Sequence, residues 1–402
     1  MVWKKVASSY YDEIYVMLDD IAKIIMELNK LKNWGLLGGN GGAILFFHYY
    51  INCSKNKIYY SEYLSNLIVN LIKDIYNTKT LGICNGLSGI CWLLRLTYNY
   101  GYLECDDINQ ILEYPERCLL TEIYRTDADT DYLHGTLGIA NYFAISDSPF
   151  SDEAINVFLN KLWVSKIKKD ETYSWLTQTY VNYKSVGLVY NLGLSHGMAG
   201  VIAFLKNILK NKNITLAVDL LSGLINFYLE NRKSYPTNSF FPKWIDPNNN
   251  YRYLENLPSW CYGDPGILNA LYDSINISNS PKDQIKDIID DLKKTSIDLL
   301  LMKSSKIYET NFCHGTAGLM HLYNNFYQKT GCDVFKRAAL KMLSVTLNRR
   351  KSENGRYAGF VLPDSNEYAN PISFLSGLSG IGLSAMAMIA NSKPEWNNIL
   401  LL

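Results

Sequence analysis

The sequence predicts an all-α fold in which seven helical hairpins close into a two-layered ring, an α/α toroid. Three observations predict it: a glycine motif that occurs seven times, an amphipathic segment ahead of the motif, and an apolar run after it. The hydrophobic content of 48% and the mean hydropathy of −0.09 are typical of a globular chain. Because repeat architectures grow beyond ordinary domain size, we expect residues 1–402 to form a single domain.

The repeated motif is G-x-x-G, and its first glycines are spaced 47 to 66 residues apart. One copy would carry little information, but seven spaced copies that each open an apolar run predict seven structural units. Glycine at the start of a helix also lets neighbouring backbones approach closely. The copies lie at 39–42, 86–89, 135–138, 197–200, 263–266, 315–318 and 377–380.

Amphipathic segments between the motifs predict the outer helices. Leu64, Leu67, Ile68 and Leu71 fall at i, i+3, i+4 and i+7, which is one face of a helix. The same periodicity predicts further outer helices in the segments 14–28, 106–114, 154–163, 216–229, 285–301 and 335–347. The pattern is weakest at 106–114.

The runs that follow the motifs, such as 201–205 and 381–389, are apolar on nearly every side and predict buried inner helices. One-faced outer helices and fully buried inner helices are both accommodated by two concentric layers. The inner helices would then be parallel, and all seven glycine loops would open at the same end of the ring. Two segments, around 170–190 and 234–260, have a different composition and predict loops or short β-hairpins on this scaffold.

Charge and composition restrict the partners. The 39 basic and 38 acidic residues give a net charge of +1, which predicts no binding to nucleic acid. The most apolar late stretch, 375–390, is too short to span a bilayer, so no transmembrane segment is expected. With no signal peptide evident either, we expect a cytoplasmic protein, in which the eight cysteines do not form a disulfide framework.

The reactive residues share positions in the repeat. Cys261 and Cys313 each lie two residues before the first glycine of their motif, and His314 lies one residue before it, as do His134 and His196. Two cysteines and a histidine from adjacent loops predict a three-ligand zinc site with one open position, the arrangement of catalytic zinc. Such a centre suits thiol alkylation or thiol addition, because zinc keeps a bound thiol deprotonated at neutral pH.

Other residues in these loops have simpler interpretations. Cys84 and Cys91 are expected to be packing residues. His134 is expected at a helix start or on the surface, and Asp131 is a candidate for capping the helix that follows.

Three segments resemble the lanthionine synthetase C family, the LanC cyclases, and the resemblance covers essentially the whole chain. They are Trp260-Cys-Tyr-Gly-Asp-Pro-Gly266, Cys313-His-Gly-Thr-Ala-Gly318 and Ser195-His-Gly-Met-Ala-Gly200. The resemblance implies an α/α toroid of seven inner and seven outer helices. It also implies one Zn²⁺ per chain, held by Cys261, Cys313 and His314.

The activity that the resemblance implies is lanthionine synthesis in lantibiotic production. A dehydratase first converts Ser and Thr of a precursor peptide to dehydroalanine and dehydrobutyrine, and the cyclase then adds peptide Cys thiols to them. By this resemblance His196 is the general acid/base, Asp131 orients or charges a catalytic partner, and Tyr262 hydrogen-bonds near the enolate.

The resemblance further implies a complex with the dehydratase and an ABC exporter, at the inner face of the membrane. One residue departs from the family pattern: Leu257 stands four positions before the first cysteine, where family members commonly have arginine. Arg252 is nearby in the sequence.

Other functions remain open at this point. A glycosidase would use two carboxylates, with Asp131 and Asp264 as candidates, but would leave the cysteines unexplained. A zinc prenyltransferase subunit would need a partner subunit. The chain could also be a non-catalytic, zinc-stabilised scaffold that binds peptides, or an enzyme that adds glutathione to dehydrated proteins.

Overall fold

A computed structural model shows how the repeats fold. It describes residues 3–28, 33–103, 108–127, 129–181, 184–233, 239–248, 252–253, 258–274, 277, 282–301, 307, 309–351, 355–364 and 370–402. No helix in this described part combines the length and the apolar character that crossing a membrane requires.

Fourteen α-helices alternate along the described chain between two kinds. Seven are buried on one face and are called outer helices: α1 (Tyr11–Leu28), α3 (Lys57–Asp74), α5 (Ile108–Tyr124), α7 (Ser151–Ser165), α9 (Thr215–Glu230), α11 (Lys282–Leu301) and α13 (Asp333–Arg349). Seven follow a glycine loop and are called inner helices: α2 (Gly41–Tyr50), α4 (Leu87–Asn99), α6 (Thr136–Ala144), α8 (Met198–Leu209), α10 (Asp264–Ser274), α12 (Thr316–Thr330) and α14 (Leu378–Ile389). Short 3₁₀ turns occur at Ser8–Tyr10, Ile75–Asn77 and Glu395–Asn397.

The strands are short and antiparallel. β1 (Ile167–Lys169) pairs with β2 (Thr172–Ser174), and a second sheet has the order β3-β4-β5-β6. Its strands are β3 (Thr177–Val181), β4 (Lys184–Asn191), β5 (Trp244–Ile245) and β6 (Arg252–Tyr253).

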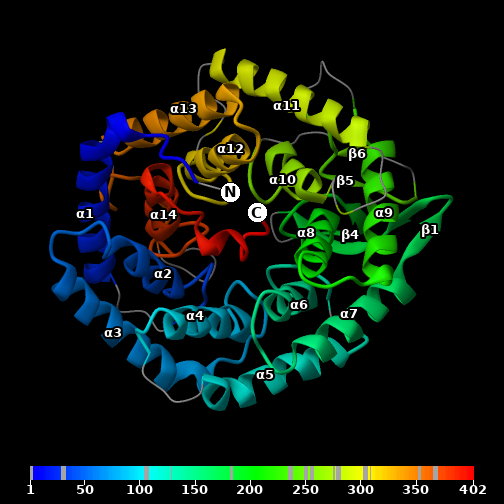
Figure 1. Ribbon diagram of the computed structural model, residues 1–402, viewed down its shortest axis with the longest axis horizontal. Coiled ribbons are helices and arrows are strands. Elements are labelled where there is room, and N and C mark those ends of the chain that lie inside the picture. Colours follow the sequence, from blue (N-terminus) through cyan, green and yellow to red (C-terminus); the bar gives the residue numbers. More distant parts are fainter. Residues whose placement is uncertain are drawn as a thin grey trace. The chain divides into compact units, whose positions relative to one another are not determined.

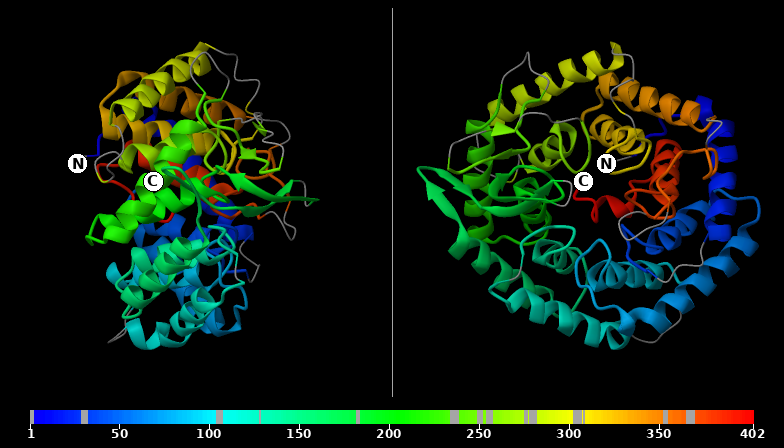
Figure 2. Two further views of the ribbon diagram at one scale, coloured as in Figure 1. Left: turned by 90° about the vertical axis from the view of Figure 1, so that its right-hand side faces the viewer. Right: turned by 180° about the vertical axis from the view of Figure 1, so that it is seen from behind.

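The chain forms two compact units. Unit 1 comprises 1–119 and 302–394, and unit 2 comprises 120–301 and 395–402. In unit 1, α14 packs between α2 and α12, and the outer helices α1 and α13 lie against this inner layer (Figure 1). In unit 2, α8 packs between α6 and α10, with α7, α9 and α11 outside them. β2 packs on α9, and the β1–β2 hairpin projects beyond it (Figure 2).

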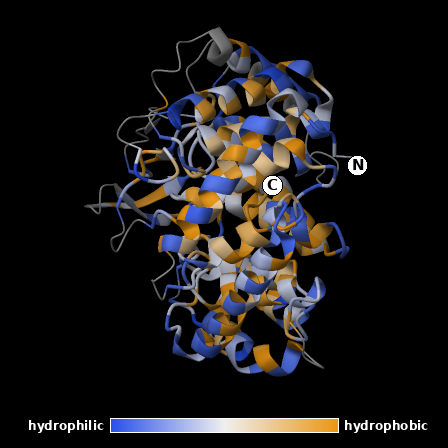
Figure 3. Ribbon diagram, turned by 90° about the vertical axis from the view of Figure 1, so that its left-hand side faces the viewer, coloured by the Kyte–Doolittle hydropathy of each residue, from blue (hydrophilic) through white to orange (hydrophobic). Residues whose placement is uncertain are grey.

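The outer helices bury one face, as their periodicity predicts. In α3, Leu64, Leu67, Ile68 and Leu71 are at most 3% exposed. Each such side chain contributes roughly 1.5–3 kcal/mol when it leaves water. The inner helices differ, because every residue of α14 is buried. Figure 3 shows hydrophilic and hydrophobic residues alternating along the outer helices that face the viewer.

The first glycine of most motifs occupies the N-cap of its inner helix, with extended backbone, as at Gly197 and Gly315. The second glycine lies under its own loop: a side chain at Gly318 would collide with the carbonyl oxygen of Phe312. The first repeat is shifted by one residue from the spacing that the sequence suggests. There Asn40 is the N-cap and α2 begins at Gly41.

A buried ion pair within unit 1 gives a test of its packing. Arg95 of α4 donates to Glu116 of α5 over 2.7 Å, and both residues are at most 8% exposed. We predict that Glu116→Ala lowers the free energy of unfolding by about 3 kcal/mol, because it leaves a buried guanidinium without its charge partner. Urea unfolding followed by circular dichroism measures this change.

The control is Glu113→Ala, which removes an exposed partner of Arg117 in the same helix. It should cost less than about 1 kcal/mol. Equal losses in the two variants would contradict a structural role for the buried pair.

Candidate functional site

Two neighbouring glycine loops of unit 2 are joined by their backbones. The loop before α8 carries His196, and the loop before α10 carries Cys261 and Tyr262. The backbone N–H groups of Leu194 and Ser195 both donate to the carbonyl oxygen of Cys261, over 2.8 and 3.3 Å. This pairing fixes the position of His196 relative to Cys261 independently of their side chains.

His196 and Asp131 form a close pair. Nδ1 of His196 lies 2.5 Å from Oδ2 of Asp131, which comes from the loop before α6. The other oxygen of Asp131 accepts the backbone N–H of His134 over 2.8 Å. Asp131 therefore bonds to the loop just before α6 and to the ring of His196 at once, but it does not cap the helix, whose N-cap is Gly135. Because Nδ1 is engaged, Nε2 is the nitrogen of His196 that can exchange a proton with a substrate.

The electrostatics of this pair favour a charged histidine. Burial lowers the pKa of His196, but the charge of Asp131 and its hydrogen bond raise it by more, so the pKa lies above its ordinary value. Burial alone would raise the pKa of Asp131, yet the neighbouring His196 lowers it on balance. The charged imidazolium–carboxylate form is thus favoured over the neutral form of the pair.

His134 lies on the other side of this pair. Its ring is stacked on that of His196, with the centroids 6.0 Å apart and the planes at 21°. The sequence predicts His134 at a helix start or on the surface, and its side chain is exposed, as expected. Desolvation lowers the pKa of His134, and the charge of His196 lowers it further, which disfavours a second positive charge beside His196.

Tyr262 is held from two directions. Asn191, the last residue of β4, donates to its hydroxyl oxygen over 3.0 Å. The ring centroid of Tyr262 lies 5.9 Å from that of His196. Gly193 makes room for this ring, because a Cβ atom there would lie 2.6 Å from Cδ1 of Tyr262. Asn191 was missed by the sequence analysis, which assigned no role to the strand that carries it.

Lys243 was missed as well. It comes just before β5, and its ammonium nitrogen lies 4.6 Å from the centre of the Tyr262 ring. The composition of 234–260 gave no signal for it, because a lysine in a polar loop is usually solvated. Leu257 lies outside the described residues, and Arg252 lies in β6.

In unit 1, Cys313 and His314 lie in the loop before α12. Sγ of Cys313 is 3.4 Å from Nε2 of His314. The backbone N–H of His314 donates to the side chain of Asn311 over 3.0 Å. Nδ1 of His314 lies 3.7 Å from Glu309, so the two ring nitrogens face different groups.

The remaining cysteines in these loops behave differently. Cys261, in unit 2, is 2% exposed, and its sulfur lies 3.8 Å from the hydroxyl of Ser259. Cys84 occupies the corresponding position before α4 and is buried, and its carbonyl oxygen accepts the N–H groups of Leu37 and Gly38. Cys91 is buried inside α4. These two residues are packed in the core, as expected.

Asp264 is not available as a second catalytic carboxylate. Its oxygens accept the backbone N–H groups of Phe240 and Phe241 over 2.9 and 3.1 Å. Burial raises its pKa to about 6 in spite of these bonds. Asp264 thus anchors this loop and Asp131 is bonded to His196, so both carboxylates of the glycosidase interpretation are engaged by other groups of the protein.

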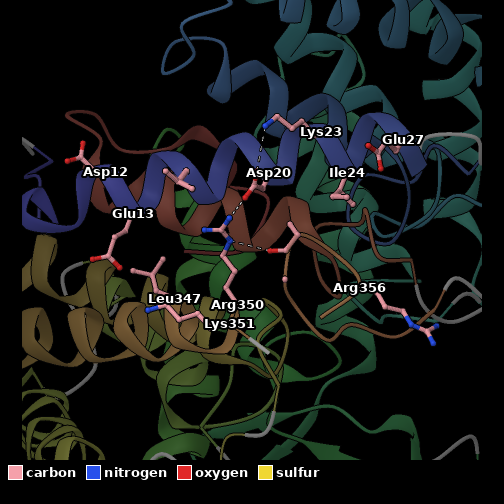
Figure 4. Close-up of a pocket in the computed structure, with 13 residues that line it drawn as sticks. Asp12, Glu13, Asp20, Lys23, Ile24, Glu27, Leu347, Arg350, Lys351 and Arg356 are labelled. Carbon is pink, nitrogen blue, oxygen red and sulfur yellow. Dashed lines mark hydrogen bonds and ion pairs between the residues drawn. The ribbon is translucent and has the colours of Figure 1, made fainter. Parts of the chain in front are cut away.

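A groove of about 830 Å³ lies elsewhere, between α1 and α13 of unit 1 (Figure 4). Arg350 crosses it, donating to Asp20 and to the carbonyl oxygen of Ala358. None of the candidate ligand or catalytic residues lines this groove.

Comparison with known proteins supports the fold. The sequence model of the family described as "Lanthionine synthetase C-like protein" matches residues 3–128 and 32–401. The solved structure of nisin cyclase matches with a TM-score of 0.73 at 20% sequence identity, covering 95% of this chain and 96% of that one. No curated protein matches the sequence. The shared fold confirms the predicted class, an all-α α/α toroid.

The pair formed by His196 and Asp131 predicts how stability depends on pH. Because folding raises the pKa of His196, its protonated ring stabilises the fold fully at pH values below the ordinary pKa of 6.5. This contribution is lost as the pH rises through the pKa that His196 has in the folded protein. Because folding lowers the pKa of Asp131, its carboxylate stabilises the fold at pH values above the ordinary pKa of 3.8, and this contribution is lost as the pH falls through the pKa in the folded protein. Asp131→Asn should therefore cost most, about 1.5–3 kcal/mol, between about pH 4 and 6.5.

Urea unfolding at about pH 5.5 and about pH 9 measures the difference. Asp127→Asn, at an exposed residue paired with Arg125, is the control and should cost less than about 1 kcal/mol at either pH. A cost for Asp131→Asn that grows toward pH 9 would show that the pair does not stabilise the charged histidine.

Proposed function

We propose that this chain, which belongs to the lanthionine synthetase C-like family and is a lanthionine-forming cyclase, forms lanthionine with the help of one zinc ion. The substrate is a dehydrated precursor peptide, whose Cys thiols add to dehydroalanine and dehydrobutyrine to form thioether rings. The observation that carries the mechanism is the contact between His196 and Asp131, in the loop layer that also carries Tyr262 and Cys261.

The zinc ligands in this proposal are Cys261, Cys313 and His314, a group that could hold a metal ion. Two thiolates and one imidazole are ligands that zinc prefers, and three protein ligands leave a position for substrate. The separation of 3.4 Å between Cys313 Sγ and His314 Nε2 suits two ligands of one tetrahedral ion. When bound, zinc would keep a peptide thiol deprotonated and nucleophilic at neutral pH.

His196 would supply the proton that completes the addition. As the carbon–sulfur bond forms, the electrons of the double bond move to the neighbouring carbonyl and leave an enolate. The protonated Nε2 of His196 then gives its proton to the α-carbon, and the proton released by the thiol restores it. The raised pKa of His196 supports this role, because it favours the protonated ring that an acid requires.

Asp131 and Tyr262 would position the reacting groups. Asp131 fixes the ring of His196 and the nitrogen it presents. Since Asn191 donates to the hydroxyl oxygen of Tyr262, the tyrosine proton remains available for the enolate oxygen. Hydrogen-bond donors fixed where charge develops are a large source of rate enhancement in such sites.

The partners follow from the family and belong to the proposal. The peptide would arrive after dehydration, in a cytoplasmic complex with the dehydratase and an ABC exporter at the membrane. A glutathione-adding enzyme would use the same thiol chemistry, so the choice of acceptor and thiol distinguishes the two.

The metal site predicts one zinc per chain. Metal analysis of the purified protein should find about one zinc, and Cys261→Ala and Cys313→Ala should each abolish it. Cys84→Ala is the matched control, because Cys84 occupies the corresponding position in the loop before α4. A protein without zinc, or zinc retained in both ligand variants, would remove the metal from the proposal.

The acid/base assignment predicts a selective loss of rate. His196→Asn should keep its zinc but cyclise a dehydrated precursor peptide about 10²–10⁴-fold more slowly, because it lacks the proton donor. Cyclisation leaves the mass unchanged, so the loss of alkylatable thiols is followed by mass spectrometry. Asp127→Asn serves as the control.

Unchanged cyclisation by His196→Asn would exclude the histidine as the acid. A wild-type protein that binds zinc but consumes no peptide thiols would favour the non-catalytic scaffold. Consumption of glutathione in place of peptide thiols would favour the glutathione-adding enzyme.

A further inference from the structure

Lys243 lies beside the reactive loops although the sequence gives no hint of it. Its carbonyl oxygen accepts the backbone N–H of Leu192 over 3.1 Å, which ties it to the residue that follows β4. Its ammonium nitrogen is 4.6 Å from the ring centre of Tyr262 and 5.5 Å from that of Trp244. A cation at these distances from the face of an aromatic ring is attracted to it.

The contact with Tyr262 places the ammonium group on the loop that carries Cys261, a proposed zinc ligand. Lys243 and Cys261 both belong to unit 2, and Tyr262, whose ring Lys243 contacts, follows Cys261 directly. Lys243 is therefore a positive charge built in next to one proposed ligand and one proposed hydrogen-bond donor.

The charges of the proposed site leave a place for such a cation. Zn²⁺ with two cysteine thiolates is neutral, and a peptide thiolate as the further ligand gives the centre a net charge of −1. Placing that charge in a partly buried site is unfavourable unless an opposite charge lies nearby. His196 is the proton donor in the reaction and cannot stay positive throughout it.

We propose that Lys243 is a positioning residue of this site: its ammonium group holds the Tyr262 ring and compensates the negative charge that a bound substrate thiolate adds. This inference rests on the proposed zinc site. It assigns to Lys243 no proton transfer and no bond to the substrate. Its effect should fall on the affinity for the thiolate, whatever happens later in the reaction.

The test measures thiol binding without turnover. The full-length protein is loaded with Co²⁺ in place of zinc, and the uncharged thiol N-acetylcysteine methyl ester is titrated in at about pH 7. Binding is followed by the sulfur-to-cobalt charge-transfer absorption. Lys243→Gln should weaken thiol binding about tenfold, whereas Lys243→Arg, which keeps the charge, should stay within about threefold of the wild type.

Lys166→Gln is the matched control, because Lys166 also lies over an aromatic ring of unit 2, 3.3 Å from the centre of Trp163. It should bind the thiol as the wild type does. Lys243→Met serves as a second uncharged variant if Lys243→Gln is unstable, since its aliphatic side chain can still pack on Tyr262.

The outcomes separate the two proposals. A wild-type protein that binds no cobalt would overturn the metal site, and the role of Lys243 with it. A wild-type protein that binds cobalt and thiol, with equal thiol affinity in the uncharged Lys243 variants, would overturn the role of Lys243 alone. Equal weakening by Lys243→Arg and Lys243→Gln would also overturn it, because the charge would not be the cause.

Discussion

The packing of each glycine loop over the start of its own inner helix is the constraint on which the rest of the structure depends. At Gly318 and at Gly266 a side chain would collide with a carbonyl oxygen of the same loop, that of Phe312 and that of Trp260. Without side chains there, the loop can fold back over the helix. The residues just before the first glycine, including Cys313 and Cys261, are thereby placed at the helix N-terminus.

The loops are then fixed to one another through backbone hydrogen bonds. In unit 2 the residues before His196 bond to the carbonyl of Cys261, and in unit 1 Phe312 and Cys313 bond to the carbonyl of Leu375. Reactive side chains on these loops therefore need no contact with each other to be positioned. A rigid layer of backbone that supports a few polar groups is the arrangement that general acid/base chemistry requires.

Charge compensation is the second theme of the site. His196 is hydrogen-bonded to Asp131, Tyr262 receives a hydrogen bond from Asn191, and the ammonium group of Lys243 lies over the Tyr262 ring. His196, Tyr262 and Lys243 thus each have a fixed neighbour within unit 2. Fixed partners matter here because a partly buried site has little water to reorganise around a thiolate or an enolate.

The sequence by itself determined the fold class, the succession of outer and inner helices, and the positions of the cysteines and histidines within the repeat. It could do so because helix periodicity and glycine spacing are local signals, and a repeat turns them into register. In the first repeat the helix begins one residue later in the motif than in the repeats of Gly197 and Gly315, with Asn40 as the N-cap. Only the tertiary structure decided that Asp131 meets His196 from a loop 65 residues away, that Asp264 holds a backbone loop, and that Asn191 and Lys243 support Tyr262. These contacts join residues that lie far apart in the sequence and on different loops and strands, and no local pattern of residues encodes which of them meet.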